Sequence, residues 1–314
     1  MQRRKRAYSP SFGILIAALA AGFAWAGEAP DSVKESPSFR ADTTLVLVPV
    51  TVIDRRGAIV SGLRDSAFTV TEDGAQRPIR SFSEEDAPVS LGIVLDLSGS
   101  MKGYLAAAKE SLRALLADAN PEDEIFVNGV STAPKAYSRF DDSFEETVKR
   151  VESEDAEGKT ALIDTICDSL KELHSGIHSR KALIVISDGM DNHSRYTSEE
   201  LRRQWAETDA QIYTVATVAF LNAIQPPKPM IMTEAKRGQM FLEDLARDTG
   251  GISFAVSNAG DIAKAAASIG RALRNEYTIG YAPSGAASGK WRKISVKVTG
   301  SGLRAYARAG YRVE

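Results

Sequence analysis

Five side chains with oxygen donors occur in this sequence where buried strands end or where a helix begins. They are Asp96, Ser98, Ser100, Thr160 and Asp188. Carboxylate, hydroxyl and water oxygens are the ligands that Mg²⁺ and Mn²⁺ prefer in proteins. A metal held mainly by neutral hydroxyls keeps an affinity for an acidic group from outside. The donor set therefore predicts a Mg²⁺ site, with Mn²⁺ or Ca²⁺ as alternatives, that leaves one position open to the carboxylate of a partner.

The two carboxylates of this set carry an electrostatic penalty when no metal is bound. Asp96 and Asp188 would repel each other by roughly 3 kcal/mol at a separation of about 6 Å and an effective dielectric constant of about 20. A bound cation removes this repulsion. We therefore expect the site to depend on metal and to be strained without it.

Two apolar runs must position these residues. Val89–Leu95 leads into Asp96, and Ala182–Ser187 leads into Asp188, as expected for parallel strands that are buried on both faces. Thr160 comes directly before a helical pattern. In an open parallel sheet, ligands bind beyond the carboxyl ends of the strands, where the strand order reverses. The three segments are therefore expected to meet at that edge of the sheet.

The wider pattern predicts an α/β domain inserted into a β domain. Strands alternate with helices over 88–274, which indicates a Rossmann-like, doubly wound and mostly parallel sheet. Residues 42–87 and 275–314 have β patterns, including a hairpin signal at Asp73-Gly74. Each β segment is too small for a stable core of its own. We therefore expect the two segments to pack together as one small β-sandwich.

Three local expectations follow from single features of the chain. Pro49 predicts an edge strand or a bulge. Phe220–Gly238 predicts a long loop on the metal side of the sheet, either a partner-contact loop or a loop folded over the domain, with the next helix beginning at Gln239. Cys167 is the only cysteine, so it forms no internal disulfide, and its helical spacing predicts a buried apolar role.

The N-terminus has the pattern of an export signal. A positive region with Arg3 and Arg4 precedes an apolar stretch, and Ala24-Trp25-Ala26 fits the small-x-small cleavage pattern. Residues 1–26 are therefore predicted to be a signal peptide and residues 27–41 a linker, with the mature chain in the periplasm or secreted. The apolar stretch is shorter than the roughly 20 residues that span a bilayer, so no stable membrane span is expected after cleavage. An uncleaved anchor is the alternative.

Other function classes have weaker support in the sequence. The net charge is −2 and no basic block occurs beyond the first residues, which excludes a typical nucleic-acid-binding protein. His174 and His178 have the spacing of zinc ligands on a helix, but no glutamate follows the first histidine, which favours an exposed helix end. A Ser98–His193–Asp188 hydrolytic triad lacks a nucleophile elbow around Ser98, and the metal explains the same residues better.

Three motifs resemble a known site. D-L-S-G-S at 96–100, T-A-L-I-D at 160–164 and S-D-G-M-D-N at 187–192 resemble the metal-ion-dependent adhesion site of von Willebrand factor A domains, over roughly residues 88–274. The β segments on either side, with V-T-V-I-D-R-R-G and Y-T-I-G-Y-A-P, resemble exported proteins related to this family, described chiefly from Acidobacteria. The resemblance implies a Rossmann-like fold, direct Mg²⁺ binding by the hydroxyl residues and largely water-mediated binding by the two aspartates.

These observations favour an exported, metal-dependent protein-binding module that is not an enzyme. Its metal would capture an Asp or Glu side chain of a protein partner. One alternative is an envelope scaffold or assembly subunit in which the metal is only structural and the β-sandwich makes the contacts. A metal-assisted hydrolase is a third and weaker alternative.

Overall fold

The computed structural model describes residues 45–84, 86–117, 119–218, 229–285 and 289–313. The expected signal peptide and linker lie outside the described residues and remain predictions. Residues 43–314 form one compact unit. No helix in the described part of this unit is both long and apolar enough to cross a membrane.

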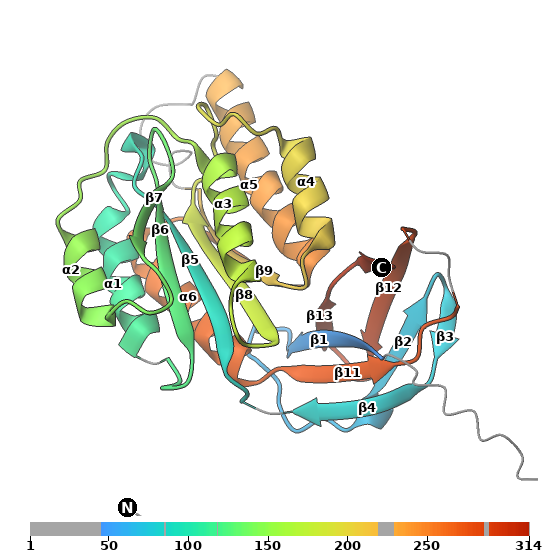
Figure 1. Cartoon of the computed structure of the whole chain (residues 1–314). Helices are drawn as coiled ribbons and strands as arrows, with labels where there is room; N and C mark the ends of the chain where they lie inside the picture. Colours follow the sequence, from blue (N-terminus) through green and yellow to red (C-terminus); the bar gives the residue numbers. More distant parts are fainter. Residues whose placement is uncertain (1–44, 85, 118, 219–228, 286–288, 314) are drawn as a thin grey trace, which may run out of the picture. The chain divides into compact units, whose positions relative to one another are not determined.

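A six-stranded sheet forms the centre of the α/β part (Figure 1). Its strands are, in spatial order, β10 (Ser253–Val256), β9 (Gln211–Thr217), β8 (Arg180–Ser187), β5 (Val89–Asp96), β6 (Glu124–Val130) and β7 (Lys135–Ser138). Every pair is parallel except β6 with β7. The chain passes from β5 to β6 on one side and later to β8 on the other. The strand order therefore reverses between β5 and β8, where ligand sites of such sheets lie.

Helices cover both faces of this sheet, as the alternating pattern predicted (Figure 1). One face packs against α1 (Leu105–Ala117), α2 (Phe144–Glu152) and α6 (Ala259–Arg274). The other packs against α3 (Leu162–His174), α4 (Ser198–Glu207) and α5 (Pro229–Thr249). Because helices lie on both sides, β5 is buried along its whole length. Cys167 is fully buried on α3, as predicted.

The N-terminal and C-terminal β segments build two antiparallel sheets together. One sheet has the order β13 (Arg304–Ala307), β1 (Val46–Ile53), β11 (Tyr277–Tyr281) and β4 (Ile79–Glu84). The other has the order β14 (Gly310–Arg312), β12 (Trp291–Val298), β2 (Phe68–Glu72) and β3 (Ala75–Arg77). Both sheets contribute to one apolar cluster that includes Val50, Val70, Ile279 and Ile294. The chain halves therefore share one core, which neither segment could form alone.

Two local expectations were wrong, each for a physical reason. The strand with Pro49 is not an edge strand, because β1 pairs with both β11 and β13. Pro49 is tolerated because the pairing with β13 covers only Val50–Ile53. The helix expected from Gln239 begins at Pro229, a residue type that suits the first turn because its missing N–H has no partner there anyway. Residues 229–238 are therefore helix, whereas 219–228 lie outside the described residues.

A mostly buried arginine makes contacts that connect the α/β part to the β part. Arg180, at the start of β8, donates to the carbonyl oxygens of Ala87 and Leu273, where the chain passes between the two parts. Its guanidinium also pairs with the carboxylate of Glu276, with an Nη2–Oε2 distance of 2.9 Å. Burial raises the pKa of Glu276, and Arg180 opposes this shift. The ion pair therefore connects the two parts of the chain around a buried carboxylate.

Candidate metal centre

Asp96 is the most buried member of the predicted site. It ends β5, and its side chain has no exposed surface. One carboxylate oxygen accepts the Ser98 backbone N–H at 2.9 Å, and the other accepts the Ser187 hydroxyl at 2.6 Å. Since Ser187 ends the neighbouring strand β8, these two bonds hold the carboxylate at the reversal point of the sheet.

The Asp96 loop comes close to Asp188. Ser98 lies next to Ser100, with a distance of 3.2 Å between the two hydroxyl oxygens. Ser100 is near enough to favour the charged form of the Asp188 carboxylate, which also accepts the backbone N–H of Met190 at 3.0 Å. The structure therefore brings the two aspartates and the two serines close together.

Thr160 belongs to a third loop that is bonded to the other two. The Gly158 carbonyl accepts the N–H of Gly99 at 3.4 Å. The Thr160 carbonyl accepts the N–H groups of Asn192 and His193, each at 3.0 Å, and its own N–H donates to the Asn192 side chain. Thr160 is buried. Backbone bonds thus place its segment between the Asp96 loop and the loop after Asp188.

Two glycines permit a close approach of helix α5 beneath Asp188. Gly189 has a φ of +76°, a left-handed conformation that few other residues adopt. A Cβ added at Gly189 would collide with the backbone of Gly238, and a Cβ at Gly238 would lie 2.6 Å from the Asp188 carbonyl oxygen. The turn after Asp188 therefore has its shape because both positions lack a side chain.

The two carboxylates of the site are electrostatically unfavourable as they stand. Burial raises the pKa of Asp96 to about 6, and the nearby charge of Asp188 adds to this effect, against the hydrogen bonds from Ser187 and Ser98. Burial also raises the pKa of Asp188, although Ser100 and Met190 oppose it. Among the described residues, no Lys, Arg or His is a main cause of either shift. The hydroxyl and carboxylate oxygens of this arrangement are suitable ligands for a hard cation.

The other candidate residues do not form comparable sites within the described ranges. No group of three or more His, Cys, Asp or Glu side chains gathers there. His174 is the exposed last residue of α3, and the His178 ring bonds the Glu122 carbonyl at 2.8 Å. His193 is exposed and contacts Thr160 through its backbone N–H. The triad suggested by sequence is therefore not assembled by any hydrogen bond of the described residues.

Sequence analysis missed two residues that shape the site. Ser187 has no role of its own in the sequence patterns beyond the end of an apolar strand and the start of a motif, yet its hydroxyl bonds Asp96. Asn192 was noted only within a motif, yet its amide oxygen accepts the Thr160 N–H at 3.0 Å. A polar residue at the last position of an otherwise apolar strand was the available signal for Ser187. No comparable local signal marks Asn192.

The comparison with known families agrees with this geometry. Residues 91–190, which include all five predicted ligands, match the model described as von Willebrand factor type A domain. The chain contains a von Willebrand factor type A domain. This confirms the family resemblance of the α/β part, whereas the resemblance of the β segments to proteins from Acidobacteria remains a prediction. No curated protein matches the sequence.

Several solved structures resemble the chain in fold. A conserved hypothetical protein, BatB, from Bacteroides thetaiotaomicron has 18% identity and a TM-score of 0.44, over 60% of this chain and 100% of that one. A von Willebrand factor type A protein from Catenulispora acidiphila has 12% identity and a TM-score of 0.48, over 88% and 74%. The corresponding domain of the type V pili tip protein Mfa5 from Porphyromonas gingivalis has 11% and 0.45, over 59% and 95%. Similarity at this level carries no functional argument.

Proposed function

We propose that this chain is an exported, metal-dependent protein-binding module. The observation that carries the proposal is the convergence of Asp96 and Asp188 with two serine hydroxyls at the reversal point of the sheet. No positive side chain of the described residues is a main cause of their pKa shifts. A site that is negatively charged and uncompensated favours a divalent cation. Mg²⁺ is the proposed ion, with Mn²⁺ or Ca²⁺ as alternatives.

We propose for the residues the roles that the family resemblance implies. Ser98, Ser100 and Thr160 would offer hydroxyl oxygens to the ion, while Asp96 and Asp188 would balance its charge. Ser187 holds Asp96 in place through its hydroxyl. The bound ion would supply the positive charge that attracts an Asp or Glu side chain of a partner.

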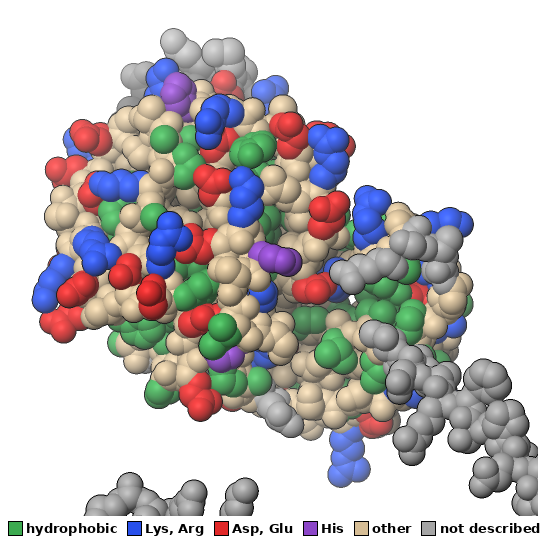
Figure 2. Space-filling view, in the orientation of Figure 1, with side chains coloured by type: hydrophobic (Ala, Val, Ile, Leu, Met, Phe, Trp, Pro, Cys, Tyr) green, Lys and Arg blue, Asp and Glu red, His purple; other side chains and the backbone are tan. Residues whose placement is uncertain are grey.

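The surface around the domain does not favour long-range attraction of one kind of partner. Acidic and basic side chains are intermixed over the face seen in Figure 2, and the chain has a net charge of only −2. Fields of mixed sign are screened within about 10 Å at moderate salt. We therefore propose that capture of the partner depends on the metal itself and on contacts next to it.

Binding of Mg²⁺ to the purified full chain is the first test. Calorimetric titration of protein stripped with EDTA should show one saturable site, and Asp188→Ala should remove it. Asp168→Ala is the matched control, because Asp168 is an exposed aspartate on α3 that pairs with Lys171. If neither Mg²⁺ nor Mn²⁺ nor Ca²⁺ binds the wild-type protein, the proposal is wrong.

Capture of partners is the second test. Envelope and secreted proteins should be retained by the immobilised chain in Mg²⁺ and released by EDTA, with loss of capture in Asp188→Ala but not in Asp168→Ala. Partner capture that persists in EDTA would instead support a scaffold whose β-sandwich makes the contacts. Ester or phosphate turnover that is lost in Ser98→Ala would support the hydrolase.

A further inference from the structure

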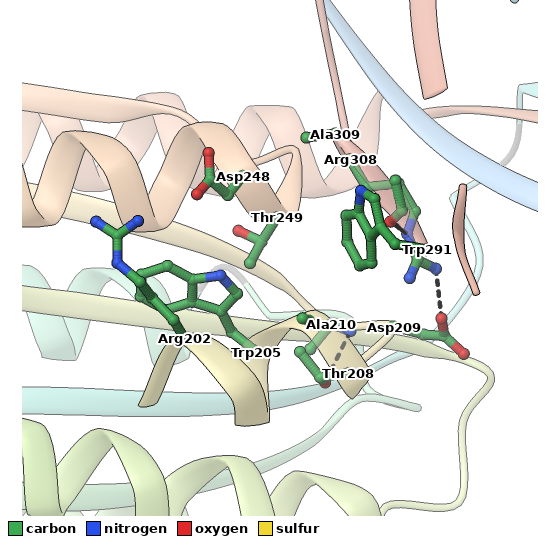
Figure 3. A pocket seen from close by; sticks show the side chains of 12 residues that line it. Arg202, Trp205, Thr208, Asp209, Ala210, Asp248, Thr249, Trp291, Arg308 and Ala309 are labelled. Atoms are coloured by element: carbon green, nitrogen blue, oxygen red, sulfur yellow. Dashed lines mark hydrogen bonds and ion pairs between the residues drawn. The ribbon is translucent and has the colours of Figure 1, made fainter. Parts of the chain in front are cut away.

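A second candidate site lies at the amino end of β9, away from the carboxyl ends of the strands. It is an open cavity of about 320 Å³ between the ends of α4 and α5 and the strands β12 and β14. Its size is at the lower end of the range of small-molecule sites, about 300–1,000 Å³. Figure 3 shows that Trp205 and Trp291 approach it from opposite sides. Nothing in the candidate metal centre contributes to its lining.

Trp291 provides an aromatic platform in this cavity. The residue is 45% exposed, although large aromatic side chains are usually mostly buried. Its ring lies against Gly310, where an added Cβ would be 2.6 Å from the Trp291 Cζ2 atom. Gly310 therefore allows the indole to lie close against the backbone of β14. The indole is supported from this side, and it also lines the cavity.

Trp205 forms the opposite wall. It is mostly buried, and the guanidinium of Arg202 lies 5.5 Å from the centre of its ring. The sequence has three tryptophans, of which Trp25 is in the predicted signal peptide. Both tryptophans of the described residues thus line one cavity. Such a concentration of indoles next to open space is typical of ligand sites rather than of a randomly composed surface.

The charged residues that line the cavity all have ion partners, although Asp248 pairs with Arg247, which lies outside the lining. Arg308 forms an ion pair with Asp209 and also donates to the Gly310 carbonyl. Arg202 pairs with Asp244 at 3.5 Å. Because each arginine has an acidic partner, the cavity offers no excess of positive charge to a phosphate and no excess of negative charge to an ammonium group. Its electrostatics favour a neutral ligand.

Polar groups at the rim are suited to hydroxyl groups. The side chain of Asp209 is 79% exposed, and its ion pair with Arg308 involves only one carboxylate oxygen. The other carboxylate oxygen can therefore accept a hydrogen bond from a ligand. The Thr208 hydroxyl accepts the Ala210 N–H at 3.1 Å, which leaves its own proton available as a donor. An acceptor and a donor are thus placed beside an aromatic platform, as Figure 3 shows.

We propose that this cavity binds a neutral saccharide unit. The apolar C–H face of the sugar ring would stack on Trp291, and its hydroxyl groups would bond Asp209 and Thr208. A sugar ring has a flat apolar face that matches the aromatic platform, and it has hydroxyl groups that match the donor and the acceptor at the rim. A proline-rich or aromatic peptide would use the platform but would give the exposed carboxylate no hydroxyl donor, so the observations favour the sugar.

Titration with defined oligosaccharides tests the proposal. The probes are cellohexaose, maltohexaose, xylohexaose and chitohexaose, added to the full chain with EDTA present so that the result is independent of the metal centre. Tryptophan fluorescence is a direct readout, because both tryptophans of the described residues line the cavity. At least one probe should bind and alter the fluorescence saturably, and calorimetry should give the same dissociation constant.

Variants show whether the platform is responsible. Trp291→Ala should weaken binding about tenfold or more, since stacking on the ring is lost. Ile177→Ala is the matched control, because Ile177 is another exposed large apolar residue and does not line the cavity. The Ile177→Ala variant should bind the saccharide with the same affinity as the wild type. The proposal is overturned if no probe binds, if Trp291→Ala binds as well as the wild type, or if only a proline-rich peptide binds.

Discussion

Replacement of Asp96 by asparagine tests whether the candidate metal centre is strained without its ion. Burial and the charge of Asp188 raise the pKa of Asp96 from an ordinary value of 3.8 to about 6. The folded protein therefore binds this proton more tightly than the unfolded chain. The contribution of protonated Asp96 to stability is greatest below pH 3.8. It is lost as the pH rises to about 6, because the carboxylate must then ionise where it is buried.

The magnitude follows from this shift. About two pKa units correspond to roughly 3 kcal/mol of lost stability in the metal-free protein above pH 6. Asparagine removes the charge but places an amide N–H₂ group where Asp96 accepts the Ser187 hydroxyl. Misplacing that donor costs about 1 kcal/mol. We therefore expect Asp96→Asn to stabilise the metal-free protein by about 2 kcal/mol at pH 8, and by less than about 1 kcal/mol at pH 5.

Urea denaturation in EDTA at the two pH values measures this effect. Asp164→Asn is the matched control, because Asp164 is also a buried aspartate but has a lowered pKa and accepts the N–H groups of Arg195 and Tyr196. It should destabilise the protein at both pH values. Mg²⁺ should stabilise the wild type and leave Asp96→Asn nearly unchanged. If Asp96→Asn destabilises the protein at pH 8 as much as the control does, the charge of Asp96 does not destabilise the metal-free protein.

Two further predictions concern buried charges outside the site. Arg180→Met should lower the free energy of unfolding by about 3–5 kcal/mol, because Glu276 would stay buried without its ion partner; Arg113→Met, which removes an exposed pair with Glu152, should cost below about 1 kcal/mol in the same urea series. Burial disfavours ionisation of Glu72, but its hydrogen bonds outweigh this and lower its pKa from 4.5 to about 2. Its stabilising effect of roughly 3 kcal/mol should therefore be present above pH 4.5 and be lost as the pH falls toward 2, whereas Glu72→Gln should lack this pH dependence in acid denaturation.

Local patterns predicted most elements of the fold because each pattern reports burial directly. The hairpin at Asp73-Gly74 is present, with φ values of 48° and 83° at these two residues, as a tight two-residue turn requires. The same patterns contain no information on which sheet a strand joins. The β pattern after the hairpin divides at Pro78: β3 pairs with β2, whereas β4 crosses to pair with β11. Short strands such as β7 and β14 were not predicted, because their pairing depends on neighbours distant in sequence.

The candidate site was predictable in composition but not in its supporting contacts. Hydroxyl and carboxylate residues at two strand ends are visible in the sequence, and the reversal of strand order brings them together. The contacts of Ser187 and Asn192 depend on the distance between loops, which no local pattern encodes. The close approach of Gly189 and Gly238 likewise joins a turn to a helix whose beginning the sequence placed ten residues too late.

The two ends of the α/β sheet differ in how completely their charges are balanced. At the amino end, Arg180 compensates the buried Glu276, and Arg308 compensates Asp209. At the carboxyl end, the buried Asp96 lies near Asp188, and no positive side chain in the described ranges is a main cause of the pKa shift of either. A chain that pairs its charges at one end can also do so at the other, so the imbalance is not a general property of the fold. Local departures from favourable energetics within an otherwise consistent structure are expected where a ligand completes the site. The imbalance is therefore the physical reason to look for the ion at the carboxyl end, and for a neutral ligand at the amino end.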